Sequence, residues 1–416
     1  IYNFIDYRGA TPTKITNGIP LVTAKNVKSG YIDYTIDDYI SEEEFKERQQ
    51  RGISKKGDIL FTTEAPLGNA ALADMEKFSA GQRLITFQQY GSKNELINYV
   101  MLMFILSDFF QQQLYVNKTG STVAGIKAAI LKTLWIPVPP YNEQLRISNT
   151  LKSAINLIDS ISKNKEILST SISNTKSKIL DLAIRGKIVP QDPNDEPASV
   201  LLERIRAEKE ELIKQGKIKR DKKESVIFKG DDNSYYGIHL PDSWNWASLR
   251  EIALSISDGS HNPPPNNGSG IPLLSAANIN DNSILMNEIS RWITNEEWKI
   301  ENQRTNIEVG DVLLTIVGSI GRSAVVQNNN HFALQRSVAV IKPCLINPLY
   351  LMHIVQSPQI QKWLTDNSKG TAQKGIYLNA LSLMIIPIPP LAEQARIVEL
   401  IHIAYKQLDL ISNALL

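Results

Sequence analysis

The chain has 416 residues, of which 42% are apolar and 21% are charged, and its formal net charge is +2; these values are typical of a globular protein with more than one domain. No apolar run is long enough to span a membrane, and the one cysteine, Cys344, allows no disulfide within the chain. We therefore expect a cytoplasmic protein. A net charge this close to zero gives no support for nucleic-acid binding by itself.

Two long stretches of the chain repeat each other at an offset of 250 to 253 residues. Both end in a proline turn, "IPVPPYNEQLRI" at 136–147 and "IPIPPLAEQARI" at 386–397. Upstream, "GIPLVTAKNV" matches "GIPLLSAANI", "YISEEEFK" matches "WITNEEWK", "GDILFTTEAPLG" matches "GDVLLTIVGSIG", and Gln82 and Arg83 match Gln335 and Arg336. A repeat of this length predicts two copies of one domain.

Each copy has the pattern of a mixed α and β domain. The β-branched runs "GDILFT", "LITFQ", "GDVLLT" and "SVAVIK" are bounded by glycine or polar residues and predict buried strands. Ser41–Glu44 and Thr294–Glu297 have the form of a capping box and predict short helices, and 97–114 and 348–365 predict longer ones. "LPDSWNWASLREIA" leads into the second copy, and nothing equivalent precedes the first. The corresponding strand of copy one is therefore either outside this chain or was never encoded.

Each proline turn is followed by apolar residues at alternating steps of four and three, which predicts the seam of a coiled coil. The seam residues are Ile147, Leu151, Ile158, Ile161, Leu168, Ile172, Ile179 and Leu182 in the first helix, and Ile397, Ile401, Leu408 and Ile411 in the second. We expect the two helices to pair with each other, antiparallel. The alternative is that each amphipathic helix lies on its own domain.

The chain therefore divides into five parts. The predicted boundaries are a first domain at 1–140, a spacer helix at 141–185, a linker with a charged helix at 186–235, a second domain at 236–390 and a C-terminal spacer helix at 391–416. The prolines at the ends of the two repeats cannot lie inside the helices and mark where each begins.

A search for catalytic patterns favours a non-catalytic chain. "NPPP" at 262–265 resembles the loop of adenine methyltransferases, but Pro265 replaces the aromatic residue that would stack on a flipped base. Asp58 and Glu64 suggest a metal-dependent nuclease pair, yet the second copy has Ile316 in a matching stretch, so a Gly-Asp turn before a strand is the favoured interpretation. The five histidines have no metal-ligand spacing, and no phosphate-binding or nucleophile motif is present. We expect no catalytic residue and no metal site.

The layout resembles the specificity subunit of type I restriction–modification systems. The similar features are the paired "IPxPPxxEQxRI" junctions, the helices after them, and "ILDLAIRGKIVPQDPNDEPASVLLERIRAEKEEL" at 179–212. "WITNEEW", "GDVLLTIVGSIGRSAVV" and "LPDSWNWASL" resemble its recognition-domain motifs. The resemblance covers nearly the whole chain. It implies an α+β fold with two similar mixed α/β target recognition domains, joined by long antiparallel coiled-coil helices in a pseudo-twofold arrangement.

The family resemblance also implies a function. Each domain would read one half of a bipartite, asymmetric DNA site, with the helices setting the distance between the halves. The partners implied are double-stranded DNA, two methyltransferase (M) subunits that methylate adenine at N6, and restriction (R) motor–nuclease subunits. S-adenosylmethionine, ATP and Mg would serve those partners, and this chain would bind no cofactor. The rival interpretation is a protein-interaction scaffold that binds no DNA.

DNA reading requires side chains at base edges and phosphates, and loops that differ between the copies are the best candidates. The hairpin-like stretches at 117–127 and 367–377 supply Lys118, Thr119, Ser121, Thr122 and Lys127, and Lys369, Thr371, Gln373 and Lys374. Further candidates are Lys25, Asn26, Arg83, Asn278, Arg322 and Arg336. A plain surface turn is the alternative for each stretch, and a structural ion pair is the alternative for Arg83 and Arg336.

Overall fold

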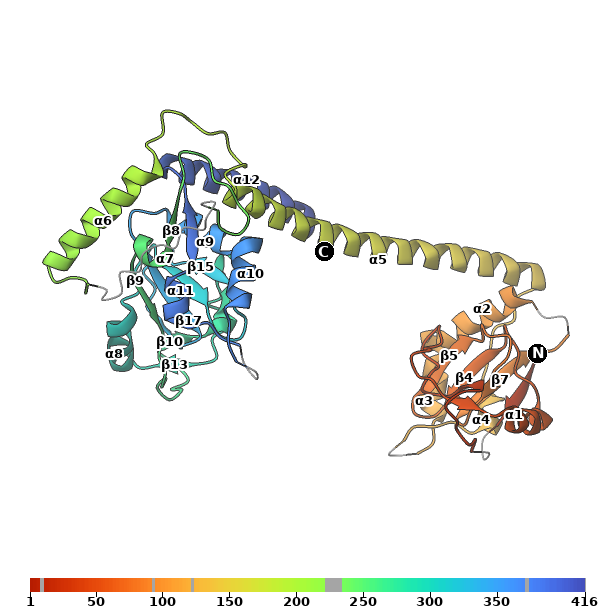
Figure 1. Ribbon diagram of the computed structural model, residues 1–416. Coiled ribbons are helices and arrows are strands. Elements are labelled where there is room, and N and C mark those ends of the chain that lie inside the picture. Colours follow the sequence, from red (N-terminus) through yellow and green to blue (C-terminus); the bar gives the residue numbers. More distant parts are fainter. Residues whose placement is uncertain (8–10, 92–93, 121–122, 221–233, 371–373, 416) are drawn as a thin grey trace. The chain divides into compact units, whose positions relative to one another are not determined.

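The computed structural model (Figure 1) describes residues 1–7, 11–91, 94–120, 123–220, 234–370 and 374–415. The chain forms two compact units, Ile1–Lys163 (unit 1) and Asn164–Leu416 (unit 2). Each unit has its own buried apolar cores. No helix among the described residues is long and apolar enough to cross a membrane.

Unit 1 is built on an antiparallel sheet with the strand order β1-β7-β4-β5. Its strands are β1 (Tyr2–Asp6), β4 (Ile59–Thr63), β5 (Leu67–Leu72) and β7 (Leu84–Gln89). Every residue of β4 is buried, because Phe61 packs with the helices on one face while Leu60 packs with Val22 and Ala80 on the other. The continuous apolar run "ILF" is therefore what a strand covered on both faces requires.

A smaller sheet and two short helices complete the N-terminal part of unit 1. Its strand order is β3-β2-β6, with β2 (Ile19–Val22), β3 (Tyr39–Ile40) and β6 (Ser79–Ala80). Helix α1 (Glu42–Arg48) and the 3-10 helix η1 (Gln49–Arg51) follow. As predicted, Ser41 caps α1: its hydroxyl accepts a hydrogen bond from the Glu44 backbone N–H at 3.2 Å.

The helical stretch expected at 97–114 is two helices, α2 (Glu95–Leu106) and α3 (Asp108–Asn117), and the short α4 (Ala128–Leu131) follows. Ser107 breaks the stretch because its backbone is extended (φ −71°, ψ 151°). The stretch expected at 348–365 is likewise split into α9 (Pro348–Val355) and α10 (Pro358–Asp366). There Pro358 removes the N–H that a continuous helix would need.

Unit 2 repeats both sheets. Its central sheet has the order β9-β17-β14-β15 and its smaller sheet the order β13-β10-β16. The strands are β9 (Ala253–Asp258), β10 (Ile271–Leu274), β13 (Trp292–Ile293), β14 (Val312–Thr315), β15 (Ser323–Val325), β16 (Ala333–Leu334) and β17 (Val338–Pro343). The shared strand order and pairing direction show that the sequence repeat is a repeat of the fold.

Unit 2 also contains elements that are not helices or strands in the described part of unit 1, although the β11–β12 pair corresponds to the single bridge of Val27 with Ile32. These are β8 (Asn245–Ser248), α7 (Leu249–Ile252), η2 (Ala276–Asn278), β11 (Ile279–Asn280), β12 (Ser283–Ile284) and β18 (Ile385–Ile388). Helix α8 (Asn295–Thr305) has the full predicted capping box between Thr294 and Glu297, and α11 (Leu378–Ser382) precedes β18. Strand β18 pairs antiparallel with β8.

Hydrogen bonds show where the repeat alignment slips by one residue. The Thr63 backbone N–H donates to Arg83 O at 2.9 Å, and the Ile316 N–H donates to Ser337 O at 2.9 Å. Thr63 ends β4 and Ile316 directly follows β14, and the two residues match in the repeat, so Arg83 occupies the position of Ser337. The sequence match of Arg83 with Arg336 is therefore wrong by one residue, because the segment 326–332 between β15 and β16 is one residue longer than the segment 73–78 between β5 and β6.

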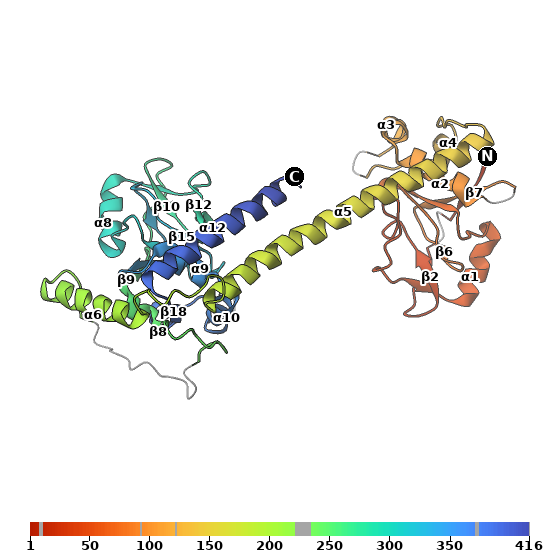
Figure 2. The ribbon, with the colours of Figure 1, turned by 90° about the horizontal axis from the view of Figure 1, so that it is seen from above.

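Three further helices complete the chain: α5 (Tyr141–Ile184), α6 (Ala198–Lys214) and α12 (Leu391–Asn413). Within unit 2, α12 lies beside the C-terminal part of α5 and runs in the opposite direction (Figures 1 and 2). The Lys176 ammonium lies 2.5 Å from the Asp409 carboxylate and 5.1 Å from the Tyr405 ring centre. The predicted antiparallel pairing is therefore present.

The predicted seam of α5 is buried or half-buried where α12 covers it and exposed in its middle part. Ile172 is 7% exposed, and Ile179 and Leu182 are half-buried, whereas Ile158 and Ile161 remain 59% and 58% exposed. On α12, Ile397 and Ile401 are fully buried, because they also face helix α9 in the main core of unit 2. The seam residues Ile147 and Leu151, at the start of α5, are half-buried within unit 1.

Candidate nucleic-acid interface

In unit 1 the stretch at 117–127 forms a hairpin at the end of the central strand β4. Thr119 and Gly125 exchange two backbone hydrogen bonds of 2.7 and 3.0 Å, and the Ile126 N–H donates to Thr63 O at 2.9 Å. Gly125 also forms a β-bridge with Glu64. Lys118, Thr119 and Lys127 are exposed on this hairpin. Ser121 and Thr122 lie outside the described residues.

Unit 2 holds an equivalent hairpin at the end of β14. Lys369 and Gly375 exchange backbone hydrogen bonds of 2.8 and 2.9 Å, and the Ile376 N–H donates to Ile316 O at 2.9 Å. Lys369 and Lys374 are exposed. Thr371 and Gln373 lie outside the described residues. Two hairpins with exposed lysines are thus fixed to the same end of two equivalent sheets.

The structure brings Arg83 to the hairpin of unit 1. Its guanidinium Nε lies 2.9 Å from the Glu64 carboxylate, with the two side chains 55% and 41% exposed. An ion pair this exposed contributes at most ~1 kcal/mol to stability, so it orients Arg83 more than it stabilises the fold. Arg336 is exposed beside the Ser260 backbone, which accepts a hydrogen bond from its N–H. Within the described part of the chain the Arg336 guanidinium forms no ion pair.

Asn26 and Asn278 are placed where they cannot read a base, so their prediction as DNA-binding residues is wrong. Asn26 is 2% exposed. Its Oδ1 accepts hydrogen bonds from the N–H and hydroxyl of Thr23, and its Nδ2 donates to the carbonyls of Asp33 and Ile36. Asn278 is 3% exposed and bonds its own loop in the same way. Each amide holds its own turn together, and Lys25, next to Asn26, is exposed.

Arg322 lies elsewhere on unit 2. Its backbone pairs with Thr315 at the β14–β15 turn, and its charge faces Asp281. Burial raises the pKa of the Asp281 carboxyl, while a hydrogen bond from Ser323 and the charge of Arg322 lower it. These interactions are with the β11–β12 turn and not with the hairpin.

Two residues near the hairpin of unit 1 were not predicted from the sequence as part of the site. Glu64 was considered only as half of a nuclease pair, and it instead pairs with Arg83. Tyr115 lies exposed beneath Lys118, whose ammonium is 3.7 Å from the centre of its ring. An exposed aromatic residue three positions before a lysine is the sequence signal that points to such an interaction.

The residues considered for nuclease chemistry are structural. Asp58 is fully buried and accepts hydrogen bonds from the Lys55 N–H at 2.8 Å and from Gln88 at 2.9 Å. The turn before β14 repeats this arrangement with Asp311 and Lys342. Among the described residues, no group of three or more histidine, cysteine, aspartate or glutamate side chains is arranged to hold a metal ion.

The chain is similar to proteins of one family. The model of the type I restriction modification DNA specificity domain matches residues 10–169 and 241–415. The EcoBI specificity subunit of Escherichia coli is 24% identical over 95% of this chain and 75% of its own length. The EcoAI specificity subunit of the same organism is 34% identical over 55% of this chain and 38% of its own length.

Solved structures share the fold. The HsdS subunit from Thermoanaerobacter tengcongensis aligns with 99% of this chain and 91% of its own, with a TM-score of 0.52 and 18% identity. A chain from a type I R-M system aligns with all of this chain and 92% of its own, with a TM-score of 0.59 and 17% identity. The domain match covers both repeats, and each repeat has the same fold. The chain therefore belongs to the family of type I restriction modification DNA specificity proteins.

Proposed function

We propose that this chain is the DNA sequence-specificity subunit of a type I restriction–modification enzyme and that each unit reads one half of a bipartite DNA site. The observation that carries the proposal is the repeated hairpin. Two units of one fold each fix a lysine-bearing hairpin to the end of the central strand. Exposed lysines attract phosphates, and the polar side chains beside them are suited to base edges.

The two hairpins also carry different neighbouring side chains, as expected if the two units recognise different DNA half-sites. The central strand is followed by Glu64 in unit 1 and by Val317 in unit 2, and each bridges the glycine of its hairpin. The fold frame is shared while the side chains on it change. Such a frame supports an asymmetric site, since each unit would present its own donors and acceptors to the major groove.

In this proposal the chain carries no catalytic residue and acts with partners. Methyltransferase (M) subunits, two in number, would methylate adenine with S-adenosylmethionine. Restriction (R) subunits would use ATP and Mg to move and cut DNA. Helix α5 would act as the spacer between half-sites. The family membership and the length of α5 support this arrangement.

Exchange of one unit tests the proposal. Residues 257–385 would be replaced by the matching segment of a relative with a different recognition site, and the methylated motif would be sequenced in a host that carries the M subunits. We expect one half of the motif to change and the other to stay. A change in both halves, or methylation that does not depend on this chain, would contradict the proposal.

A gel-shift titration separates DNA reading from a scaffold role. The chain with its M partner would be titrated against duplex carrying the motif and against shuffled duplex, over a range of salt concentrations. A reader binds the motif more tightly and loses affinity as salt rises. A scaffold would bind neither duplex while still assembling with the partner.

A further inference from the structure

Arg83 has a backbone conformation that arginine rarely adopts. Its φ is +64°, in the left-handed region, where a side chain crowds the carbonyl oxygen that follows it. The conformation is held because the Arg83 carbonyl accepts two hydrogen bonds from Thr63, from its N–H at 2.9 Å and its hydroxyl at 3.1 Å. Ser337, the equivalent in unit 2, is not among the described residues with positive φ. Strain of this kind is concentrated at functional sites, so the side chain of Arg83 calls for a functional explanation.

Glu64 orients that side chain. Its Oε1 lies 2.9 Å from Arg83 Nε, and both side chains are partly exposed. Its Oε2 lies 3.6 Å from the position that a Cβ atom on Gly125 would take, so the glycine of the hairpin leaves room for the carboxylate. Within the described residues the Arg83 guanidinium has no other partner. Pairing through Nε leaves the edge formed by Nη1 and Nη2 for another acceptor.

Both members of this ion pair are replaced in unit 2. Val317 bridges the hairpin glycine there, as Glu64 does in unit 1. Ser337 takes the place of Arg83, and its hydroxyl accepts a hydrogen bond from the Ala276 N–H at 3.0 Å. Unit 2 thus keeps the strand ends and the hairpin without the ion pair. The fold therefore does not require Glu64 and Arg83.

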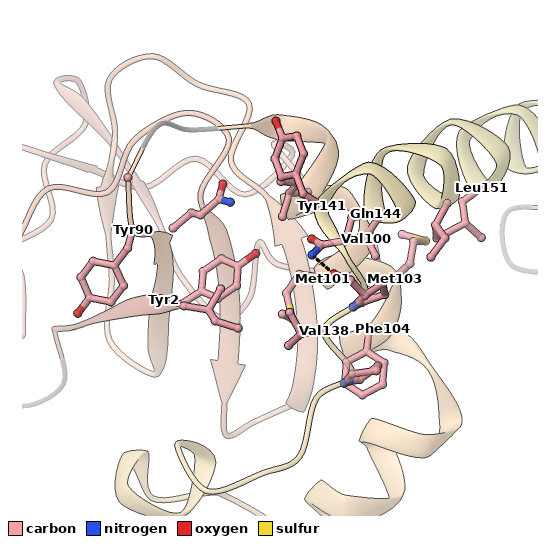
Figure 3. A pocket seen from close by; sticks show the side chains of 17 residues that line it. Tyr2, Tyr90, Val100, Met101, Met103, Phe104, Val138, Tyr141, Gln144 and Leu151 are labelled. Carbon is pink, nitrogen blue, oxygen red and sulfur yellow. Dashed lines mark hydrogen bonds between the residues drawn. The ribbon is translucent and has the colours of Figure 1, made fainter.

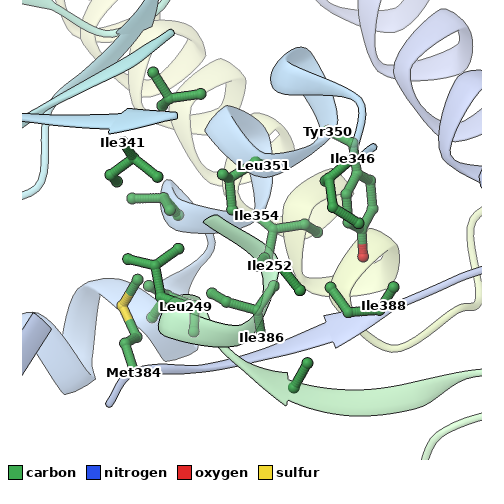
Figure 4. Packing of buried hydrophobic residues seen from close by; sticks show 14 of the residues in the cluster. Leu249, Ile252, Ile341, Ile346, Tyr350, Leu351, Ile354, Met384, Ile386 and Ile388 are labelled. Atoms are coloured by element: carbon green, nitrogen blue, oxygen red, sulfur yellow. The ribbon is translucent and has the colours of Figure 1, made fainter. Parts of the chain in front are cut away.

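The strands that carry these positions are firmly supported in both units. In unit 2, Ile341 of β17 belongs to one buried core with Leu351 and Ile354 of α9 (Figure 4). In unit 1, Phe87 of β7 belongs to one core with Ile105 of α2. Side chains at the ends of packed strands are held more precisely than side chains on loops. Such positions suit the recognition of a rigid partner.

A cavity of about 650 Å³ lies at the opposite end of β7 from Arg83. Helix α2, the start of the chain and the first turns of α5 form its walls, and Gln89, the last residue of β7, lines it. Its described lining side chains, Tyr2, Met101 and Val138 among them, are uncharged (Figure 3). An uncharged surface does not attract phosphates. The groups suited to DNA are therefore at the Arg83 end of the strand.

A guanidinium beside a carboxylate presents two donors and an acceptor next to one another. A G·C base pair presents the complementary pattern in the major groove: guanine offers N7 and O6 as acceptors, and cytosine offers its N4 amino group as a donor. Arginine is the residue that most often binds guanine in this way, and a glutamate can accept from cytosine N4. Since Glu64 repels phosphates, the ion pair favours base edges over the DNA backbone.

We propose that Glu64 and Arg83 together read one G·C base pair in the half-site of unit 1. The Nη1 and Nη2 groups of Arg83 donate to guanine O6 and N7. Glu64 positions the guanidinium and accepts a hydrogen bond from N4 of the cytosine. This assignment rests on the proposed function and deepens it, because it names the base pair that two residues recognise. In unit 2, Val317 and Ser337 cannot make these contacts.

Selection from random duplexes tests the proposal. The full chain with its M partner is mixed with a library of duplexes of random sequence, and the bound duplexes are sequenced. The altered chain carries Glu64→Val and Arg83→Ser, which introduce the residues of unit 2. We expect both chains to select the same bipartite motif, with the preference for one G·C pair reduced about 5- to 150-fold in the altered chain. An unchanged preference at every G·C pair overturns the proposal.

Modified DNA tests the contact without a change in the protein. 7-Deazaguanine has a C–H group in place of N7, so it removes one of the two acceptors for Arg83. At the selected guanine it should weaken binding of the unaltered chain at least fivefold. Binding of the Arg83→Ser chain should not respond to it. Equal weakening of both chains, or of neither, contradicts the proposed contact.

Two variants exclude effects of folding and of charge. Arg83→Gly suits the left-handed backbone, so the unfolding temperature should not fall while the preference for the G·C pair is lost. The matched control is the ion pair of Glu196 with Arg204, whose side chains are 49% and 50% exposed. Glu196→Val with Arg204→Ser should leave the motif unchanged. A retained preference in the glycine variant, or the same loss in the control, overturns the proposal.

Failure of the proposal and failure of the proposed function give different results. If no chain selects any motif, the proposed function is contradicted, and the reading of a G·C pair falls with it. If a bipartite motif is selected and none of its G·C pairs depends on Arg83, only the assignment to Glu64 and Arg83 is overturned. The double substitution leaves the net charge unchanged, so the salt dependence of binding should stay the same.

Discussion

Gln111 and Gln361 make the same two hydrogen bonds in the two units. Gln111 Nε2 donates to the carbonyls of Gly68 and Ile105, and Gln361 Nε2 donates to those of Gly321 and Val355. Each glutamine thereby connects the break between two helices, α2 and α3 or α9 and α10, to the turn that follows the central strand. Both glycines have positive φ, 92° and 98°, and a side chain on either would meet the glutamine.

The first prediction concerns this pair. Gln111→Ala should lower the free energy of unfolding of unit 1 by about 1–3 kcal/mol, because two carbonyl groups lose their donor. Gln361→Ala should do the same in unit 2. Hydrogen exchange followed by mass spectrometry reads the two units separately. Equal loss of protection in both units from one substitution would contradict independent units.

The second prediction concerns the spacer helix. Ile172→Ala removes a buried side chain beside α12 and should cost roughly 2–4 kcal/mol, while the matched Ile161→Ala, on an exposed position, should change stability by less than about 0.5 kcal/mol. Urea unfolding of the purified chain measures both. A large effect at Ile161 would mean that another segment covers this part of the seam.

The third prediction concerns pH. His353 is buried, and burial lowers its pKa to about 4, from about 6.5 in the unfolded chain. Above pH 6.5 the imidazole is neutral in both states. As pH falls from 6.5 to 4, only the unfolded chain takes up the proton, so unit 2 loses up to roughly 3 kcal/mol.

The matched control for this loss is His353→Met, since unit 1 has Met103 at the equivalent position. The variant should remove the part of the pH dependence that lies between pH 6.5 and 4. Thermal unfolding at half-unit steps of pH measures it. Identical pH profiles for the two proteins would show that His353 does not supply this dependence.

The fourth prediction concerns the hairpin of unit 1. Lys118→Ala and Lys127→Ala should weaken binding to all duplexes about equally and lower the salt slope by about 1 for each phosphate that is no longer neutralised. Lys163→Ala, exposed on α5, is the charge-matched control and should bind as the unaltered chain does. Fluorescence titration at several salt concentrations, with the M partner present, measures these slopes.

The fifth prediction concerns spacing. Insertion of one heptad after Ile161, in the exposed part of α5, lengthens the helix by about 10 Å and keeps the face of each residue. We expect the methylated motif to keep both half-sites and to gain spacer base pairs. A motif with an unchanged spacer would show that α5 does not set the distance.

Several features of the structure follow from local sequence. The strands "ILFTT" and "VLLT", the caps at Ser41 and Thr294, and the helix that begins after Pro140 are all present as predicted. Hydrophobic periodicity and capping residues act over a few positions. They can therefore be recognised in the sequence without knowing which segment packs against the element. The repeat is equally visible, since both copies retain the residues that form these elements.

Other features depended on interactions between distant residues. The match of Arg83 with Arg336 rested on the identity of the two residues in the sequence. The backbone hydrogen bonds between the strands instead make Arg83 equivalent to Ser337. The amide of Asn26 is a group that can contact adenine in DNA. In the structure, however, its oxygen and nitrogen form hydrogen bonds with Thr23, Asp33 and Ile36 of its own loop. Neither outcome is visible in the sequence, because strand register and loop closure are fixed by the partner segment.

The sequence by itself determined the duplicated domain, the long helices and the family resemblance, because each is a pattern of neighbouring residues or a comparison of the chain with itself. Only the tertiary structure decided that identical "EQxR" motifs are buried in one unit and open in the other. Burial is a property of what packs against a residue, and Glu393 has such a neighbour in Trp244 while Glu143 is exposed.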